Sequence, residues 1–122
     1  MTTPEKINVA EKLAAFTDHW APKIIAELNG QHVKLAKIEG EFVWHAHDDV
    51  DELFMVIDGE LEMQFRDRTV TLAAGECIVV PRGVEHCPRA ARETSILLFE
   101  PTGTLNTGDA GGDRTVSAPE RL

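Results

Sequence analysis

Residues 40–59 decide the fold of this 122-residue chain, and they read Gly40-Glu41-Phe42-Val43-Trp44-His45-Ala46-His47-Asp48-Asp49-Val50-Asp51-Glu52-Leu53-Phe54-Met55-Val56-Ile57-Asp58-Gly59. His45 and His47 are two residues apart, so on an extended segment both side chains point to the same face and can hold one ion together. An acidic turn then leads to Glu52 at the head of the apolar run 53–57, which ends at an Asp-Gly turn signal. The stretch predicts two imidazoles and a carboxylate on neighbouring strands.

A second block completes the pattern, and it reads Gly75-Glu76-Cys77-Ile78-Val79-Val80-Pro81-Arg82-Gly83-Val84-Glu85-His86. Pro81 fixes one backbone angle and Gly83 tolerates the other, so the chain bends sharply after the short apolar strand 77–80. The bend can bring the imidazole of His86 to the first block.

The two blocks resemble the two signature motifs of the cupin superfamily. The first motif, G-x5-H-x-H-x3,4-E-x6-G, is matched by Gly40, His45, His47, Glu52 and Gly59, with four residues rather than five after Gly40. The second, G-x5-P-x-G-x2-H-x3-N, is matched by Gly75, Pro81, Gly83 and His86. Ala90 replaces the Asn, which is not a metal ligand in the family, so the departure affects a hydrogen bond behind the ion rather than the ion itself.

The resemblance implies an all-β fold, an antiparallel jelly-roll or cupin barrel, with a divalent metal bound by His45, His47, Glu52 and His86. Neutral imidazoles and a carboxylate suit iron, manganese, nickel, cobalt or zinc, and the ligand set does not identify the ion. Such a set leaves coordination positions open on an octahedral ion for water, dioxygen or a chelating substrate oxygen. Because the ligands must be deprotonated, we expect metal affinity to weaken as the pH falls.

Length and pattern indicate one domain over residues 1–122. Residues 1–23 are expected to form a helix, which Asn8 begins as the cap, and a connection in which His19 and Trp20 cover an end or side of the barrel. Residues 24–100 form the barrel and residues 101–122 an irregular tail. Strand-like runs within the barrel lie at 24–28, 32–39, 53–57, 60–66, 69–72, 77–80 and 94–99. The glycine-rich end of the tail, from Gly108 onward, is expected to contribute little to the core.

The pocket is expected to be partly apolar, with five inward-pointing candidates, namely Phe54, Val56, Met63, Phe65 and Val79. If Val33, Leu35 and Lys37 share the inward face of their strand, Lys37 lies near the mouth of the barrel. We expect the Lys37 side chain to extend its ammonium group into water rather than to contact a substrate. Cys77 and Cys87 are interpreted as reduced thiols.

The function expected from these residues is that of a small metal-dependent enzyme acting on a small organic molecule, either a dioxygenase or an isomerase or lyase. The alternative is a module that binds a small ligand without turning it over. Short chains of this type resemble the cupin part of mannose-6-phosphate isomerases, a likeness that implies the barrel and the metal rather than isomerisation of sugar phosphates. Apolar pocket walls favour a neutral or chelating ligand.

Charge and hydropathy restrict the partners and the location. A formal net charge of −9 repels phosphate backbones and anionic lipid surfaces, so nucleic acid and membranes are not expected partners. No signal peptide is evident at the N-terminus, and a cytoplasmic location is expected. The runs 53–57 and 96–99 are apolar on both faces and need an outer cover, either from the N-terminal segment or from a second subunit. A homodimer is therefore expected.

Overall fold

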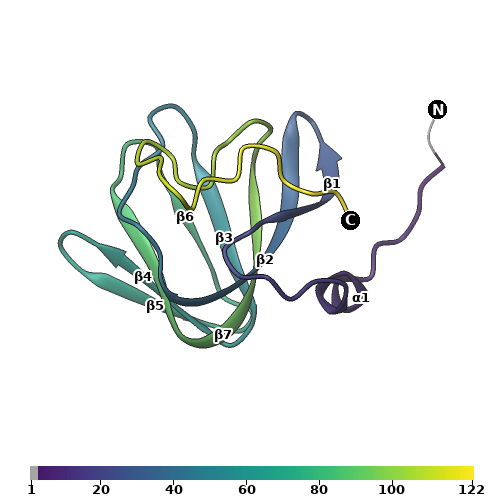
Figure 1. Ribbon diagram of the computed structural model, residues 1–122, viewed down its shortest axis with the longest axis horizontal. Coiled ribbons are helices and arrows are strands. Elements are labelled where there is room, and N and C mark those ends of the chain that lie inside the picture. Colours follow the sequence, from purple (N-terminus) through teal and green to yellow (C-terminus); the bar gives the residue numbers. More distant parts are fainter. Residues whose placement is uncertain (1–2) are drawn as a thin grey trace.

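The computed structural model describes residues 3–122, which form a bent antiparallel β-barrel with one short helix (Figure 1). The elements are α1 Val9–Ala14, β1 Lys23–Leu28, β2 Gln31–Glu41, β3 Glu52–Asp58, β4 Glu60–Phe65, β5 Thr69–Ala73, β6 Cys77–Val80 and β7 His86–Pro101. The all-β jelly-roll architecture is confirmed. None of the helical structure within residues 3–122 has the length and hydropathy needed to cross a membrane.

The long strand β7 joins the two sides of the barrel. Hydrogen bonds order the sheet as β1-β2-β7-β3-β6, and β4 pairs with both β5 and β7. The first residues of β7 pair with β4, whereas its second half lies between β2 and β3. Figure 1 shows the result, with β4 and β5 on one side of the molecule and β1 and β2 on the other.

β7 begins eight residues earlier than the run of apolar residues at 94–99 predicts. Its first half contains Pro88 and several polar residues, so the sequence there has little strand propensity. This half of β7 is held in the strand conformation by pairing with neighbouring strands on both sides. Met63 of β4 lies opposite Pro88, and Gly40 of β2 lies opposite Ala90. Tertiary pairing therefore outweighs local preference in this half of the strand.

The N-terminal segment contacts the barrel through Phe16 and Trp20 rather than through the helix. Asn8 caps α1 as predicted, its side chain accepting a hydrogen bond of 3.0 Å from the Glu11 backbone, but the helix buries none of its residues. The side chain of Lys37 was expected to extend into water, but it does not. Its ammonium donates to the Phe16 carbonyl at 2.7 Å and lies 5.0 Å from the centre of the Phe16 ring, because β2 presents this side chain to the N-terminal segment.

The hydrophobic core lies inside the barrel, and alternation along the strands builds it. Its buried members are Ala36, Ile38, Phe54, Val56, Leu61, Met63, Leu72, Val80, Ala90, Ile96 and Leu98. Gly59 makes the tight β3–β4 turn with φ +101°, and a Cβ there would lie 2.4 Å from the Thr94 hydroxyl oxygen. Close contact with β7, as well as backbone conformation, therefore requires glycine at this turn.

The C-terminal tail, residues 102–122, is attached to the barrel at several points along its length, although none of its residues from Gly108 onward is buried, in agreement with the expectation that this part adds little to the core. Figure 1 shows it in yellow, crossing one end of the barrel towards β1. Thr107 is fully buried, and the Leu122 backbone donates to the Ile24 carbonyl of β1 at 2.9 Å. Backbone and side-chain hydrogen bonds, rather than large apolar residues, attach the tail, and for this reason composition did not reveal it.

Candidate metal centre

Four buried side chains converge at one end of the barrel interior, and each comes from a position that the two sequence motifs predict. They are His45 and His47 from the segment after β2, Glu52 from the first residue of β3, and His86 from the first residue of β7. Each offers one ligand atom, and the four atoms lie within 4.8 Å of one another. The structure therefore brings together the whole predicted ligand set.

Backbone hydrogen bonds between the two motif segments hold this arrangement. His45 and His86 face each other as an antiparallel bridge, with N···O distances of 3.0 Å and 2.9 Å in the two directions. The Gly83 backbone donates to the His47 carbonyl at 2.8 Å, and its φ of +79° explains the glycine at this bend. The acidic turn is fixed in the same way, because Asp51 accepts from the Arg82 backbone at 2.9 Å. Its pKa is lowered by that hydrogen bond.

Two of the imidazoles are oriented by carbonyl groups two residues before them. Nδ1 of His45 donates to the Val43 carbonyl, and Nδ1 of His86 donates to the Val84 carbonyl, both at 2.9 Å. In the neutral ring, a proton on Nδ1 leaves the lone pair on Nε2. Both rings therefore present a metal-binding Nε2 to the centre, and the carbonyl partner fixes the tautomer.

The ligand atoms fit a cation because nothing else satisfies them. Among residues 3–122, Nε2 of His47, Nε2 of His86 and Oε1 of Glu52 are buried without a hydrogen-bond partner. The Glu52 oxygen lies 3.4 Å from the His47 nitrogen and 3.7 Å from that of His86. Buried polar atoms are seldom left unpaired, and lone pairs that point at one another repel. A divalent ion among them would satisfy all three.

Burial and neighbouring charge shift the pKa values of these groups towards the protonation states that bind an ion. Burial, together with the nearby His86 and His47, lowers the pKa of His45 to about 4, so its ring stays neutral at physiological pH. Burial alone would raise the pKa of Glu52, but a hydrogen bond from Glu100 and the nearness of His47 and His86 outweigh it and hold that pKa well below its ordinary value. Neutral imidazoles and an ionised carboxylate are the protonation states that bind metal.

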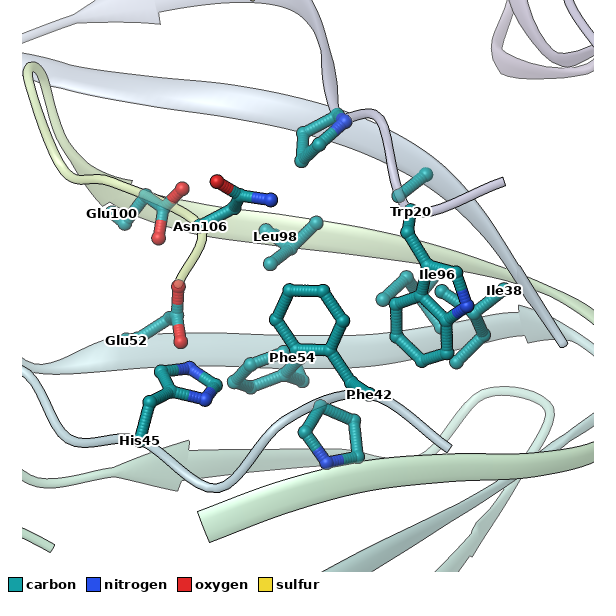
Figure 2. A pocket seen from close by; sticks show the side chains of 13 residues that line it. Trp20, Ile38, Phe42, His45, Glu52, Phe54, Ile96, Leu98, Glu100 and Asn106 are labelled. Carbon is teal, nitrogen blue, oxygen red and sulfur yellow. The ribbon is translucent and has the colours of Figure 1, made fainter. Parts of the chain in front are cut away.

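Glu100 is a second buried carboxyl group beside the ligands. It is 2% exposed, and Lys34, equally buried, donates to its Oε1 at 2.8 Å. Figure 2 shows the carboxyl groups of Glu100 and Glu52 pointing towards each other. Burial, then the hydrogen bond and charge of Glu52, raise the pKa of Glu100 well above its ordinary value, and Lys34 only partly opposes them.

A narrow cavity of about 40 Å³ opens beside the ligands. Its polar residues are His45, Glu52, Glu100 and Asn106, and Figure 2 shows them at one end of the group of lining side chains. Its other lining residues are apolar, namely Trp20, Pro22, Ala36, Ile38, Phe42, Phe54, Pro88, Ile96 and Leu98. The apolar lining with polar groups at one end suits a small, largely apolar molecule or one group of it.

Of the five predicted pocket residues, Phe54 alone lines this cavity. Val56 and Met63 are fully buried in the core, and Phe65 packs against it while lining a shallow surface hollow. Val79 is 54% exposed, so its placement in the pocket is wrong. The next residue, Val80, is buried instead, because the short strand β6 has the opposite alternation to the one assumed.

Sequence reasoning missed several cavity residues. Trp20 was expected only to cover the barrel, yet it lines the cavity, with its ring stacked on Phe42 at a centroid distance of 4.7 Å. Lys34 and Glu100 were also overlooked, although a signal existed. Glu100 follows Ile96 and Leu98 at two-residue spacing, so it is a charged side chain on the inward face of an apolar strand. Nothing local marks Asn106, which the folded tail brings to the site.

Comparisons with known proteins agree with this architecture. Residues 31–100 match the family model described as a cupin domain. An uncharacterised protein YdbB of Bacillus subtilis is 40% identical over 94 residues, which are 76% of this chain and 77% of that protein. A cupin-2 domain containing protein from Shewanella frigidimarina is 52% identical, with a TM-score of 0.77 over 78% of this chain and 93% of that one. Protein NMB1881 from Neisseria meningitidis is 34% identical, with a TM-score of 0.74 over 80% and 100% of the two chains.

Proposed function

This chain belongs to the cupin family, and from that premise we propose that it is a metal-dependent enzyme acting on a small, largely apolar organic molecule. One observation carries the proposal: unpaired ligand atoms of a buried His-His-Glu-His group lie at the polar end of a cavity with apolar walls. A closed structural site would leave no such space beside the ion.

The residues of the site have different roles in this proposal. His45, His47, Glu52 and His86 would hold a divalent transition metal, which when bound supplies a Lewis acid or redox centre for a ligand oxygen. The apolar walls exclude water and position the body of the molecule. Among the described residues that line the cavity there is no Arg or Lys, so a phosphorylated sugar finds no counter-charge there. The site thus supports a neutral substrate better than mannose 6-phosphate.

The first test is elemental analysis of protein purified without an affinity metal column. We expect about one transition-metal ion per chain, lost from His86→Ala, because an octahedral site cannot readily spare one of three imidazoles. His19→Ala is the matched control, since His19 binds Glu93 on the surface at 2.8 Å, away from the centre. A wild-type protein that binds no transition metal would contradict the proposal.

A panel of small oxygenated molecules, offered with and without oxygen, then identifies the reaction class. Oxygen uptake coupled to loss of one compound supports a dioxygenase, and turnover that persists without oxygen supports an isomerase or lyase. Metal-loaded protein that binds a compound but converts none would replace the enzyme with the non-catalytic binding module.

We also propose that the protein is a homodimer. β3 and β7 carry a continuous outer apolar surface, formed by the cross-strand pairs Leu53–Phe99 and Met55–Leu97 and extended by the exposed Val79 of β6. The helix α1 buries none of its residues and lies at the far side of β2 in Figure 1, so it does not supply the expected cover. A second copy of the chain would cover this surface.

A further inference from the structure

The mouth of the cavity beside the metal centre is formed by three residues. Among the described residues that line the cavity, all are buried except Trp20, Phe42 and Asn106, which are partly exposed. They come from separate segments, namely the connection before β1, the chain just after β2 and the C-terminal tail. The cavity therefore reaches the surface where these side chains meet.

In this conformation the cavity is too small for a substrate. Its volume of about 40 Å³ accommodates a few water molecules at most, whereas pockets for small organic molecules enclose about 300–1,000 Å³. The strands β2, β3 and β7 form most of its wall, and the pairing of β7 with β2 and β3 fixes their positions. The mouth is therefore the part of the wall that can widen without breaking the sheet.

Trp20 lies at this mouth with a strained backbone. Its φ of +58° is in the left-handed region, which bulky residues rarely adopt. Two hydrogen bonds hold it there, from its backbone to the Lys37 carbonyl at 2.9 Å and from its indole Nε1 to the Glu39 carbonyl at 3.0 Å. Its ring also stacks on that of Phe42, with a centroid distance of 4.7 Å. Because strain raises the energy of the closed arrangement, displacing Trp20 costs less than these contacts alone would require.

Arg114 of the tail contacts every residue of the mouth. Its guanidinium carbon lies 5.7 Å from the ring centres of both Trp20 and Phe42, and its backbone carbonyl accepts from the Asn106 side chain at 2.8 Å. The guanidinium also donates to the Glu41 carbonyl at 2.9 Å. Arg114 is itself exposed, and a cation–π contact at an exposed site is weak. It can therefore hold the mouth closed and still release it.

We propose that Trp20 is a specificity-determining gate, which must swing away from Phe42 to admit a substrate, and that Arg114 is the latch that holds it shut. This inference rests on the proposed function, because it describes how a molecule reaches that site. Trp20 limits the size of the molecules that enter, and Arg114 sets how often the gate opens. The alternative route is a hollow between the acidic turn and the tail, lined by His47 and Asp48 among others, and the tests distinguish the two.

The first test follows hydrogen exchange of the Trp20 indole N–H by NMR in the full chain, with or without metal. Its hydrogen bond to the Glu39 carbonyl must break when the gate opens. We expect a protection factor at least about tenfold lower than those of the most protected amides of β2 and β7, because exchange needs only a local opening. Arg114→Gln should speed the exchange about two- to fivefold and leave those amides unchanged. Protection equal to that of the strand amides would overturn the inference, because Trp20 would then move only on global unfolding.

The second test uses the full chain loaded with Co²⁺ and two probes that bind an open cobalt position, imidazole and the bulkier 4-phenylimidazole. Stopped-flow absorption measures their association rates. Trp20→Gly removes the ring and tolerates the left-handed backbone without strain. We expect it to raise the association rate of 4-phenylimidazole at least about tenfold, and that of imidazole much less, since loss of the stacked ring and its hydrogen bond widens the mouth.

Matched controls separate the gate from a general loosening of the fold. Asn29→Gly relieves a similar φ of +50° in the β1–β2 turn, and Arg66→Gln removes a guanidinium 3.9 Å from the centre of the Trp44 ring. Neither residue lines the cavity, so both variants should keep the wild-type association rates and the wild-type exchange of Trp20. Equal acceleration in these controls would overturn the inference.

An unchanged rate for 4-phenylimidazole in Trp20→Gly would also overturn it and would favour the acidic hollow as the route. A wild type that fails to bind Co²⁺ refutes the proposed function itself. That result is distinct, because the exchange experiment tests the gate without metal.

Discussion

At the scale of single residues, Gly108 packs the tail closely against the segment that carries the candidate metal ligands His45 and His47. A Cβ at this position would lie 2.4 Å from the Ala46 carbonyl oxygen and 3.0 Å from Cδ2 of His45. Its φ of +53° adds the usual cost of a left-handed conformation. Gly111 has a similar φ of +63° but open space around it. Comparing substitutions at the two glycines therefore separates the cost of the backbone conformation from the cost of close packing.

We predict that Gly108→Ala lowers the free energy of unfolding by about 2–5 kcal/mol, the sum of the backbone cost and the overpacking. Gly111→Ala should lower it by about 1 kcal/mol. Urea denaturation measures both, and metal titration should show weaker affinity in Gly108→Ala alone, because His45 must move. Equal losses in the two variants would mean that the tail gives way without disturbing the ligands.

The two cysteines also differ at this scale. Cys77 is exposed, whereas Cys87 is fully buried, and burial together with the charge of Glu41 raises the pKa of its thiol to about 11. At pH 8 the Cys87 thiol is therefore both protonated and inaccessible, and the thiolate is the reactive form.

We predict that one thiol per native chain reacts rapidly with a disulfide reagent at pH 8 in protein diluted to the monomer, because Cys77 lies opposite Met55 on the proposed dimer contact, and that both thiols react after denaturation. Cys77→Ser should abolish the rapid phase, whereas Cys87→Ser should leave it intact. Rapid labelling of native Cys77→Ser would show that the start of β7 opens.

At the scale of elements, the tail crosses the end of the barrel that contains the site and is hydrogen-bonded to it. Asp109 makes two hydrogen bonds with Ala46, one from the Ala46 backbone to its carboxylate at 2.8 Å and one from its own backbone at 3.0 Å. Ala46 lies between two of the metal ligands. Further along, the Arg114 guanidinium donates to the Glu41 carbonyl at 2.9 Å and lies 5.7 Å from the centre of the Trp20 ring.

Truncation after Gly108 should therefore cost stability, contrary to what the glycine-rich composition suggests. We predict a fall in the free energy of unfolding of about 2 kcal/mol or more, because at least three hydrogen bonds are lost, together with weaker metal binding. Asp109→Ala should reproduce part of both effects, and Asp113→Ala, at an exposed position of the same tail, should reproduce neither. Wild-type stability and metal affinity in the truncated chain would restore the view that the far tail is dispensable.

At the scale of the whole molecule, the outer surface of β3, β6 and β7 is the contact that we propose for the homodimer. Met55 lies within it, partly exposed and opposite Cys77 on one side and Leu97 on the other. A charge at the centre of a buried interface is costly to desolvate, whereas one on a free surface is not.

We predict a dimer at micromolar concentration in sedimentation analysis, converted to monomer by Met55→Glu with little change in metal content. Leu28→Glu is the control, since Leu28 is 47% exposed and lies at the end of β1, which pairs with β2 and not with β3, β6 or β7. A Met55→Glu protein that remains dimeric would place the interface elsewhere. A wild type that sediments as a monomer would show that there is no such interface.

The sequence by itself determined the barrel and the four candidate metal ligands, because both depend on local spacing. Two-residue alternation places His45 and His47 on one face, and the Pro81–Gly83 bend returns the chain so that His86 meets them. The alternation around Gly59 likewise identified the core residues Leu61 and Met63.

Only the tertiary structure decided the cavity, the tail and the length of β7. Val79 was assigned to the wrong face because a four-residue strand gives too short a pattern to fix its alternation. Glu100 and Asn106 reach the site through strand register and through the folding of the tail, which no local spacing encodes. Ligand residues are set by periodicity along the chain, whereas the surroundings of the ligands are set by which distant segments pack against them.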